Sequence, residues 1–225
     1  IKALAALPFE LTQAQIKSIS EIEADMTLSS RMLRLLQGDV GSGKTVVAMI
    51  ALLMAVEAGT QGAFMAPTEL LARQHIEALS PMAQAAGIRL ALLTGRERGQ
   101  KRDALLAELK SGEIDILVGT HALFSEDVEF HDLGFAVVDE QHRFGVHQRL
   151  ELQGKGQTPP DVLVMTATPI PRTLQLTAYG DMEVSRLIGK PPGRKPVTTR
   201  VLSAERLEEV VDALRRVIAD DARAY

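Results

Sequence analysis

Three glycines, a lysine and a threonine lie close together between two apolar runs, in the stretch LLQGDVGSGKTVV. They fit the pattern of a glycine, four residues, then Gly-Lys-Thr, which places Gly38, Gly43, Lys44 and Thr45 in one loop. Glycines let successive backbone N–H groups point into one concavity, and the start of the following helix adds partial positive charge. The apolar run before the loop and the helical pattern after it are the context that such a loop needs. The stretch therefore predicts a site for the phosphates of a nucleotide.

The predicted contacts to ATP come from both the backbone and the side chains of this loop. Lys44 would reach the β and γ phosphates, and the hydroxyl group of Thr45 would bind Mg²⁺. A chance match in a glycine-bearing turn is the alternative, although average glycine usage of about 7% makes such a match rare. The loop residues expected to bind ATP are Gly38, Asp39, Gly41, Ser42, Gly43, Lys44 and Thr45.

A second stretch, FAVVDEQH, ends an apolar run in two carboxylates. Asp139 would hold Mg²⁺, directly or through water, and Glu140 would orient and polarise the attacking water. The alternative is an acidic loop start without a catalytic role. The phosphate loop elsewhere in the chain favours the catalytic interpretation, because a bound Mg-triphosphate needs an acidic partner. Lys44, Asp139 and Glu140 are therefore the predicted catalytic residues for ATP hydrolysis.

Composition limits the class of protein. Of the 225 residues, 46% are hydrophobic and 24% are charged, as is ordinary for a soluble globular protein. Cysteine is absent, which excludes disulfides and cysteine-based zinc sites and favours a cytoplasmic location. The longest apolar run, Val46 to Val56, is well short of the roughly 20 residues that span a bilayer, so no membrane partner is expected. The net charge of −4 means that any binding of nucleic acid must depend on local basic groups and backbone amides.

Short apolar runs alternate with helical patterns along the chain, and this alternation predicts an α/β fold with a doubly wound, mostly parallel sheet and helices on both faces. The expected strands are Arg34–Leu36, Gly62–Ala66, Arg89–Leu93, Ile114–Val118, Phe135–Val138, Val162–Met165, Val184–Ile188 and Thr199–Leu202. The expected helices are Lys44–Ala58, Glu69–Ala86, Gln100–Lys110, Pro171–Tyr179 and Ala204–Asp220. The chain lacks an initiating Met and ends on an amphipathic helix, so it is expected to be a piece of a longer polypeptide.

Further blocks extend the interpretation from an ATPase to a motor. DEQH is a DExH box, and it resembles superfamily 2 helicases and translocases. The other blocks occur in that family's order: LPFELTQAQ, APTELLARQH, LTGR, VGTHAL and MTATPIPRT. The resemblance implies a RecA-like P-loop NTPase lobe with ATP, Mg²⁺ and DNA as its ligands.

The resemblance also implies a role for each block. Gln15 and Phe9 would contact adenine, and an exposed glutamine at a helix start is the alternative for Gln15. Thr68, Gly95, Thr120 and His121 would bind DNA. A helix cap at Thr68 and structural loop roles for Thr120 and His121 are the alternatives. His142 would be a fourth catalytic residue, and with Thr166 and Thr168 it would couple hydrolysis to movement. A structural histidine is the alternative for His142.

The blocks GDVGSGKT, GTHALF, VVDEQHRFGVHQR, MTATPIPRTL and PPGRKPVTT together resemble the RecG family of bacterial branch-migrating DNA helicases. That resemblance implies regression of stalled forks and branch migration on branched or forked DNA, in repair and recombination. The nearest rival is a transcription-repair coupling translocase like Mfd, which typically has Tyr where Ser42 stands. A non-motor, nucleotide-dependent binding module is a third alternative.

The resemblance implies a division of the chain. Residues 1–190 would form the first helicase lobe, 191–198 a Pro/Gly linker, and 199–225 the truncated start of the second lobe. Superfamily 2 motors place ATP between two lobes, and the RecG family carries a wedge domain upstream. Both the rest of the second lobe and the wedge domain would be partners from the same polypeptide. The 225-residue chain alone is therefore expected to hydrolyse ATP weakly or not at all.

Overall fold

The computed structural model describes residues 9–139, 155, 158–168, 182–189, 199 and 201–219. The chain divides into two compact units, Ile1–Pro191 and Pro192–Tyr225, which are described separately. The described strands of the first unit are β1 (Leu33–Gly38), β2 (Gln61–Met65), β3 (Leu90–Leu93), β4 (Ile116–Gly119), β5 (Leu133–Asp139), β6 (Asp161–Thr166) and β7 (Glu183–Leu187). Its described helices are α1 (Gln13–Met26), α2 (Lys44–Glu57), α3 (Glu69–Ala86), α4 (Gln100–Lys110) and the short 3-10 helix η2 (His121–Phe124).

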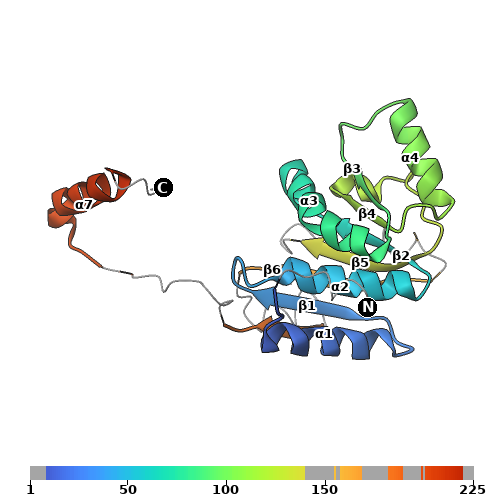
Figure 1. Ribbon diagram of the computed structural model, residues 1–225, viewed down its shortest axis with the longest axis horizontal. Coiled ribbons are helices and arrows are strands. Elements are labelled where there is room, and N and C mark those ends of the chain that lie inside the picture. The colour runs from blue at the N-terminus through green and yellow to red at the C-terminus, as the bar shows by residue number, and fades with distance from the viewer. Residues whose placement is uncertain are drawn as a thin grey trace. The chain divides into compact units, whose positions relative to one another are not determined.

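The seven strands form one sheet in the order β3-β4-β2-β5-β6-β1-β7 (Figure 1). All of its described strand pairs are parallel. Parallel neighbours require crossover connections, and α2, α3 and α4 supply those that join β1, β2, β3 and β4 along the chain. The predicted α/β fold with a mostly parallel, doubly wound sheet is therefore confirmed.

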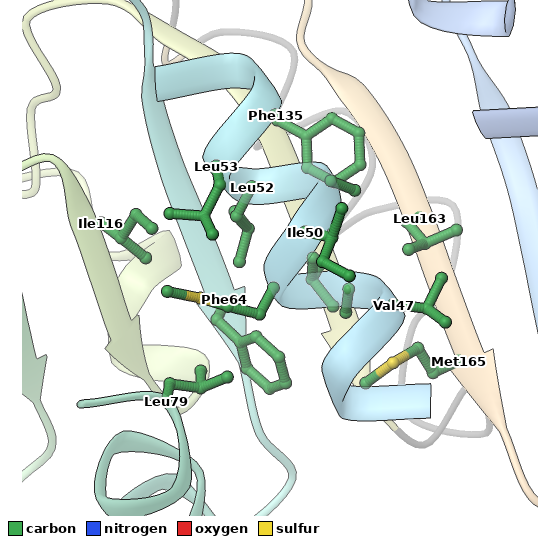
Figure 2. Close-up of a cluster of buried hydrophobic side chains, with 14 of the residues drawn as sticks. Val47, Ile50, Leu52, Leu53, Phe64, Leu79, Ile116, Phe135, Leu163 and Met165 are labelled. Carbon is green, nitrogen blue, oxygen red and sulfur yellow. The ribbon is translucent and has the colours of Figure 1, made fainter. Parts of the chain in front are cut away.

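Consecutive apolar residues in each central strand supply two cores, one on each face of the sheet. Leu36 and Val137 belong to the core that α1, α2 and α3 cover. Their neighbours Leu35 and Val138 belong to the core on the face that α4 covers. Side chains alternate between faces along a strand, so an unbroken apolar run is what burial on both faces requires. Figure 2 shows the first core, where side chains of α2 meet those of the sheet.

Local signals account for the ends of the helices. Thr68 caps the start of α3, where its hydroxyl group accepts a hydrogen bond from Leu71 N, and Gly87 caps the end of the helix in the left-handed region with φ 72°. α1 begins with a capping box, in which Thr12 and Gln15 each accept a hydrogen bond from the other's backbone N–H. α1 is absent from the predicted helices, although this Thr-x-x-Gln pattern was a signal for it.

The second unit contains η4 (Ala204–Arg206) and α7 (Leu207–Ala219). The predicted strand Thr199–Leu202 is wrong, because residues 199, 201 and 202 form no strand and Val201 is 95% exposed. A strand needs a neighbour to receive its hydrogen bonds, and the described part of this unit contains no other strand. The predicted helix Pro171–Tyr179 lies outside the described residues. Among the described helices, none combines the length and apolar character needed to cross a membrane.

Candidate nucleotide and DNA site

The predicted phosphate loop connects β1 to α2. Gly38 is the last residue of β1, and Gly43 is the residue that caps the start of α2. Gly41 and Gly43 have φ of 75° and 88°, in the region that favours glycine. No side chain caps the start of α2 within the described part of the chain. Among the described residues, no side chain therefore accepts a hydrogen bond from the first backbone N–H groups of α2. A helix start of this kind suits the binding of an anion.

Gln15 holds this loop from the side. Its Nε2 donates to the carbonyl oxygen of Ser42 at 3.0 Å, and its Oε1 accepts from Thr12 N at 2.8 Å. The residue is only 4% exposed, so it is a helix-start glutamine but not a solvated one. A Cβ atom on Gly43 would lie 2.1 Å from Nε2 of Gln15, so a side chain there would displace the amide. The glutamine thus supports the loop in this structure, while Phe9 is half-exposed.

The charged and polar groups of the loop fit a phosphate. Nζ of Lys44 donates to the carbonyl oxygens of Gly38 at 2.6 Å and Asp39 at 3.1 Å, so the ammonium group lies over the loop. The hydroxyl group of Ser42 is buried and has no hydrogen-bond partner among the described residues. Thr45 is partly buried in the first turn of α2. A loop that presents a lysine, an unsatisfied hydroxyl group and a helix start fits the phosphates of ATP.

The predicted metal-binding carboxylate lies at the same edge of the sheet. Asp139 ends β5 opposite Met165 of β6, and Thr166 of β6 lies opposite Gln37 of β1. β6 thus separates β5 from β1, and two steps of about 4.8 Å place their ends about 10 Å apart. Within the described residues, no group of three or more acidic or histidine side chains could hold a metal ion. One carboxylate and one hydroxyl group are nonetheless enough for a Mg²⁺ that phosphates and water also bind.

Two of the predicted coupling residues, Thr166 and Thr168, lie at the end of β6 and just after it, and β6 lies between β1 and β5 in the sheet. The hydroxyl groups of Thr166 and Thr168 are 3.0 Å apart, and Thr168 N donates to Oγ1 of Thr166 at 3.2 Å. Nε2 of Gln37 donates to the carbonyl oxygen of Thr168 at 3.3 Å. The end of β6 is therefore bonded to the strand that leads into the phosphate loop. Glu140 and His142 lie outside the described residues.

Sequence reasoning missed a partner of Asp139. Nε2 of His75, on α3, lies 2.8 Å from Oδ2 of Asp139. The ring of His75 also packs against Phe64, with 4.6 Å between ring centroids. No spacing along the chain points to this pair, because 64 residues separate its members. Only the fold brings α3 and the end of β5 together.

The predicted DNA-binding residues follow the other strands at the same edge of the sheet. Thr68 lies after β2, Gly95 after β3, and Thr120 and His121 after β4. Thr68 caps α3, which is the alternative role predicted for it from the sequence. The cap does not exclude a contact to DNA. Thr120 is buried, whereas Gly95 and His121 are exposed. Exposed backbone and hydroxyl groups at strand ends can hold phosphates without much net charge.

Ion pairs connect two of these segments. Nε of Arg96, in the loop after β3, lies 3.0 Å from Oε1 of Glu69 at the start of α3. Glu97 accepts from both the backbone N and the hydroxyl group of Thr94, at 2.6 and 2.7 Å. Burial raises the pKa of Glu97, but the hydrogen bonds from Thr94 and the charge of Arg73 outweigh it, so the pKa is lowered. The loop after β3 is thereby held in place beside α3.

Comparisons with known proteins identify the family of the chain. The DEAD/DEAH box helicase family model matches residues 12–177. The ATP-dependent DNA helicase RecG of Haemophilus influenzae is 49% identical over 98% of this chain, and RecG of Bacillus subtilis is 49% identical over all of it. A solved structure of RecG bound to a three-way DNA junction superimposes with a TM-score of 0.82 at 44% identity, over 97% of this chain and 29% of that one.

The chain spans about a third of the length of these RecG relatives, 32% in one and 33% in the other. The predicted resemblance to RecG and the predicted helicase fold are confirmed, since the similarity extends over nearly the whole chain. The residues that this family model matches include the glycine-rich loop, Asp139, and the residues predicted to bind DNA and to couple hydrolysis to movement. The chain belongs to the DEAD/DEAH box helicase family.

Proposed function

We propose that this chain is the ATP-binding lobe of a RecG-like DNA translocase, which couples ATP hydrolysis to branch migration and to regression of stalled forks. The observation that carries the proposal is the convergence of the phosphate loop and Asp139 on one edge of the sheet. It is supported by 49% identity to RecG helicases over nearly the whole chain. A lobe of an Mfd-like coupling translocase is the second candidate, since it would use the same nucleotide site.

The residues of the chain would divide the work on ATP as follows. The backbone N–H groups of the loop and the ammonium group of Lys44 would bind the phosphates. Thr45 and Asp139 would hold Mg²⁺, which supplies charge neutralisation when bound. Glu140 would orient the attacking water, and His142 would sense the nucleotide state. Gln15 would keep Ser42 and the loop in shape beside adenine, which Phe9 would cover.

DNA would bind at the loops that follow β2, β3 and β4, the strands beside the nucleotide half of the sheet. Thr68, Gly95, Thr120 and His121 would contact phosphates, which suits a chain of net charge −4. Branched DNA is the proposed substrate because a RecG structure similar to this chain holds a three-way junction. Thr166 and Thr168 would pass the nucleotide state to the rest of the motor.

The remaining parts of the motor are proposed to lie in the same polypeptide. Residues 1–190 would be the first lobe, 191–198 a linker, and 199–225 the start of a second lobe that supplies an arginine to the transition state. A wedge domain upstream would split the junction. The protein would work in the cytoplasm, where replication forks of bacteria lie.

The test is the ATPase rate of the full-length protein on forked and on linear DNA. We expect forked DNA to stimulate the rate more than linear DNA does. Lys44→Ala and Glu140→Gln should abolish the stimulated rate while leaving the protein folded. Equal rates with and without DNA would argue for a non-motor module. Stimulation by RNA polymerase in place of forked DNA would favour the Mfd-like alternative.

A further inference from the structure

The Asp139 carboxylate is held by a side chain from a distant part of the chain. Nε2 of His75 lies 2.8 Å from Oδ2 of Asp139. An ionised carboxylate can only accept hydrogen bonds, so the ring nitrogen is the donor. The side chains are 13% and 14% exposed, so water competes poorly for the bond. A charge-assisted hydrogen bond in such a place restricts how the carboxylate can turn.

The imidazole itself is fixed by the core. Its ring packs against Phe64 with an angle of 45° between the ring planes. Phe64 is fully buried on β2, where Figure 2 shows it near Leu79 of α3. Ala72 and Leu79 are buried on α3 at three residues before and four residues after His75, so all three share the buried face of the helix. His75 is therefore positioned by the packing of α3 rather than by solvent.

The bond crosses the boundary between the two halves of the site. The predicted nucleotide residues follow β1, β5 and β6, which are adjacent in the sheet. The predicted DNA residues follow β3, β4 and β2, which are also adjacent, and β2 borders β5. α3 begins after Thr68 on the DNA side, and His75 lies seven residues further, about 10 Å along the helix axis.

We propose that His75 is a positioning residue: it orients the Asp139 carboxylate for Mg²⁺ and connects that carboxylate through α3 to the DNA-binding end of the helix. The inference rests on the proposed function, because it takes Asp139 as the metal-binding carboxylate. A shift of α3 on binding DNA at Thr68 would reach Asp139 through the hydrogen bond from His75. Hydrogen-bond partners of metal-binding carboxylates typically contribute about 10–100-fold to metal affinity or activity.

Two substitutions separate the hydrogen bond from the packing. His75→Phe keeps a ring against Phe64 but removes the donor. His75→Gln keeps an N–H donor at a similar reach but removes the ring. In the full-length protein we would titrate Mg²⁺ at a fixed concentration of a fluorescent ATP analogue and measure binding rather than turnover. Thermal unfolding of both variants would show that each is folded at the temperature of the titration.

If the donor is what matters, His75→Phe should need roughly tenfold more Mg²⁺ for half-maximal binding, while His75→Gln should stay within about twofold of the unmodified protein. Binding of the analogue in the absence of Mg²⁺ should be the same in all three proteins. The ratio of ATPase rates with and without forked DNA should also fall in His75→Phe and recover in His75→Gln. An unchanged Mg²⁺ requirement in His75→Phe, or an equal loss in both variants, would overturn the role assigned to His75.

A third variant separates this inference from the proposed function. Lys44→Ala should abolish binding of the ATP analogue. If Lys44→Ala abolishes binding while His75→Phe leaves the Mg²⁺ requirement unchanged, the proposed nucleotide site is supported and the role of His75 is wrong. If Lys44→Ala binds the analogue as the unmodified protein does, the proposed nucleotide site is wrong, and the inference about His75 falls with it.

Discussion

Two features require glycine at position 43: the positive φ of the backbone and its close approach to Gln15. Gly87 has only the first feature, so it allows the two effects to be distinguished. Both Gly43 and Gly87 have positive φ, 88° and 72°. A Cβ atom on Gly87 would meet nothing within 4 Å, whereas one on Gly43 would collide with Gln15. An alanine in the left-handed region costs about 1–2 kcal/mol wherever it stands. Only at Gly43 does the substitution also disturb the loop.

We therefore expect Gly87→Ala to lower the free energy of unfolding by about 1–2 kcal/mol and to leave ATP binding unchanged. Gly43→Ala should weaken ATP binding roughly tenfold or more, because displacing Gln15 distorts backbone donors worth about 1.5–3 kcal/mol each to a charged ligand. Calorimetric titration with ATP and urea unfolding would measure the two effects. Equal ATP affinity in the two variants would contradict this reading of Gly43.

The carboxyl group of Asp161 gives a prediction that depends on pH. It is buried at the start of β6, where Oδ1 accepts a hydrogen bond from Met32 N at 2.8 Å. Burial raises the pKa of Asp161, and the hydrogen bond from Met32 and the charge of Arg31 offset only part of that rise. Asp161 therefore holds its proton more readily in the folded protein than in the unfolded chain. Its contribution to stability is fully present below the ordinary carboxyl pKa and is lost as the pH rises through the raised pKa.

Asp161→Asn keeps an acceptor for Met32 N without the buried charge. We expect it to raise the unfolding temperature at pH 7 by about 1–3 °C, and we expect the gain to vanish below about pH 3.5, under the ordinary aspartate pKa. Asp115→Asn is the control, since its carboxylate also accepts from a backbone N–H, that of Arg89 at 2.7 Å, but lies nearer to solvent. The stability of Asp161→Asn is compared with that of the unmodified protein at each pH. If this difference is less favourable at pH 7 than at pH 3.5, the raised pKa of Asp161 is refuted.

At the scale of elements, one buried arginine holds α1 against the sheet. Arg34 of β1 is 6% exposed, and its Nε donates to Asp25 of α1 at 2.7 Å. Its Nη1 donates to the hydroxyl group of Ser185 on β7 at 2.9 Å and lies 3.6 Å from Glu21 of α1. Since α1 also carries Gln15, this cluster supports the phosphate loop from a distance.

Arg34→Met keeps the length of the side chain and removes these bonds. We expect a loss of about 1.5–3 kcal/mol in the free energy of unfolding, the usual contribution of hydrogen bonds to charged groups. Lys17→Met is the matched control, because Lys17 pairs with Glu21 at 3.8 Å while 78% exposed; it should change stability by less than about 0.5 kcal/mol. Urea unfolding of both variants would measure the two losses in the free energy of unfolding. Similar losses would mean that burial does not strengthen the bonds of Arg34.

Most elements with local signals could be predicted from the sequence, although α1 was missed despite its capping box. Features that depend on distant partners could not be predicted. α2 and α3 follow from apolar periodicity and glycine stops, and the sheet class follows from apolar runs that bury both faces. The segment Thr199–Leu202 contains residues that are typical of strands, but the described part of its unit contains no strand with which it could pair. The strand order, and with it the contact between His75 and Asp139, depends on how crossovers pack, which no local pattern records.

For the whole molecule, the order of strands separates the predicted nucleotide residues from the predicted DNA residues along one edge of the sheet. The strands before the predicted nucleotide residues are neighbours, and so are those before the predicted DNA residues. Parallel strands bring all of these loops to the same edge, where ligands of α/β sheets bind. In the proposed function a single sheet would hold both ligands, with the boundary between β2 and β5.

The lone 225-residue chain provides the last prediction. In the proposed motor, a second lobe supplies the arginine that stabilises the transition state, a contribution of about 10³–10⁵ in rate in other NTPases. We expect the isolated chain to bind Mg-ATP weakly and to hydrolyse it slower than the full-length protein by about that factor. Forked DNA should stimulate only the longer protein. Steady-state ATPase assays on both, with circular dichroism to show that the short chain is folded, would measure the difference. Efficient unwinding of forked DNA by the isolated chain would contradict the two-lobe mechanism, since every group needed for turnover would then have to lie within these residues.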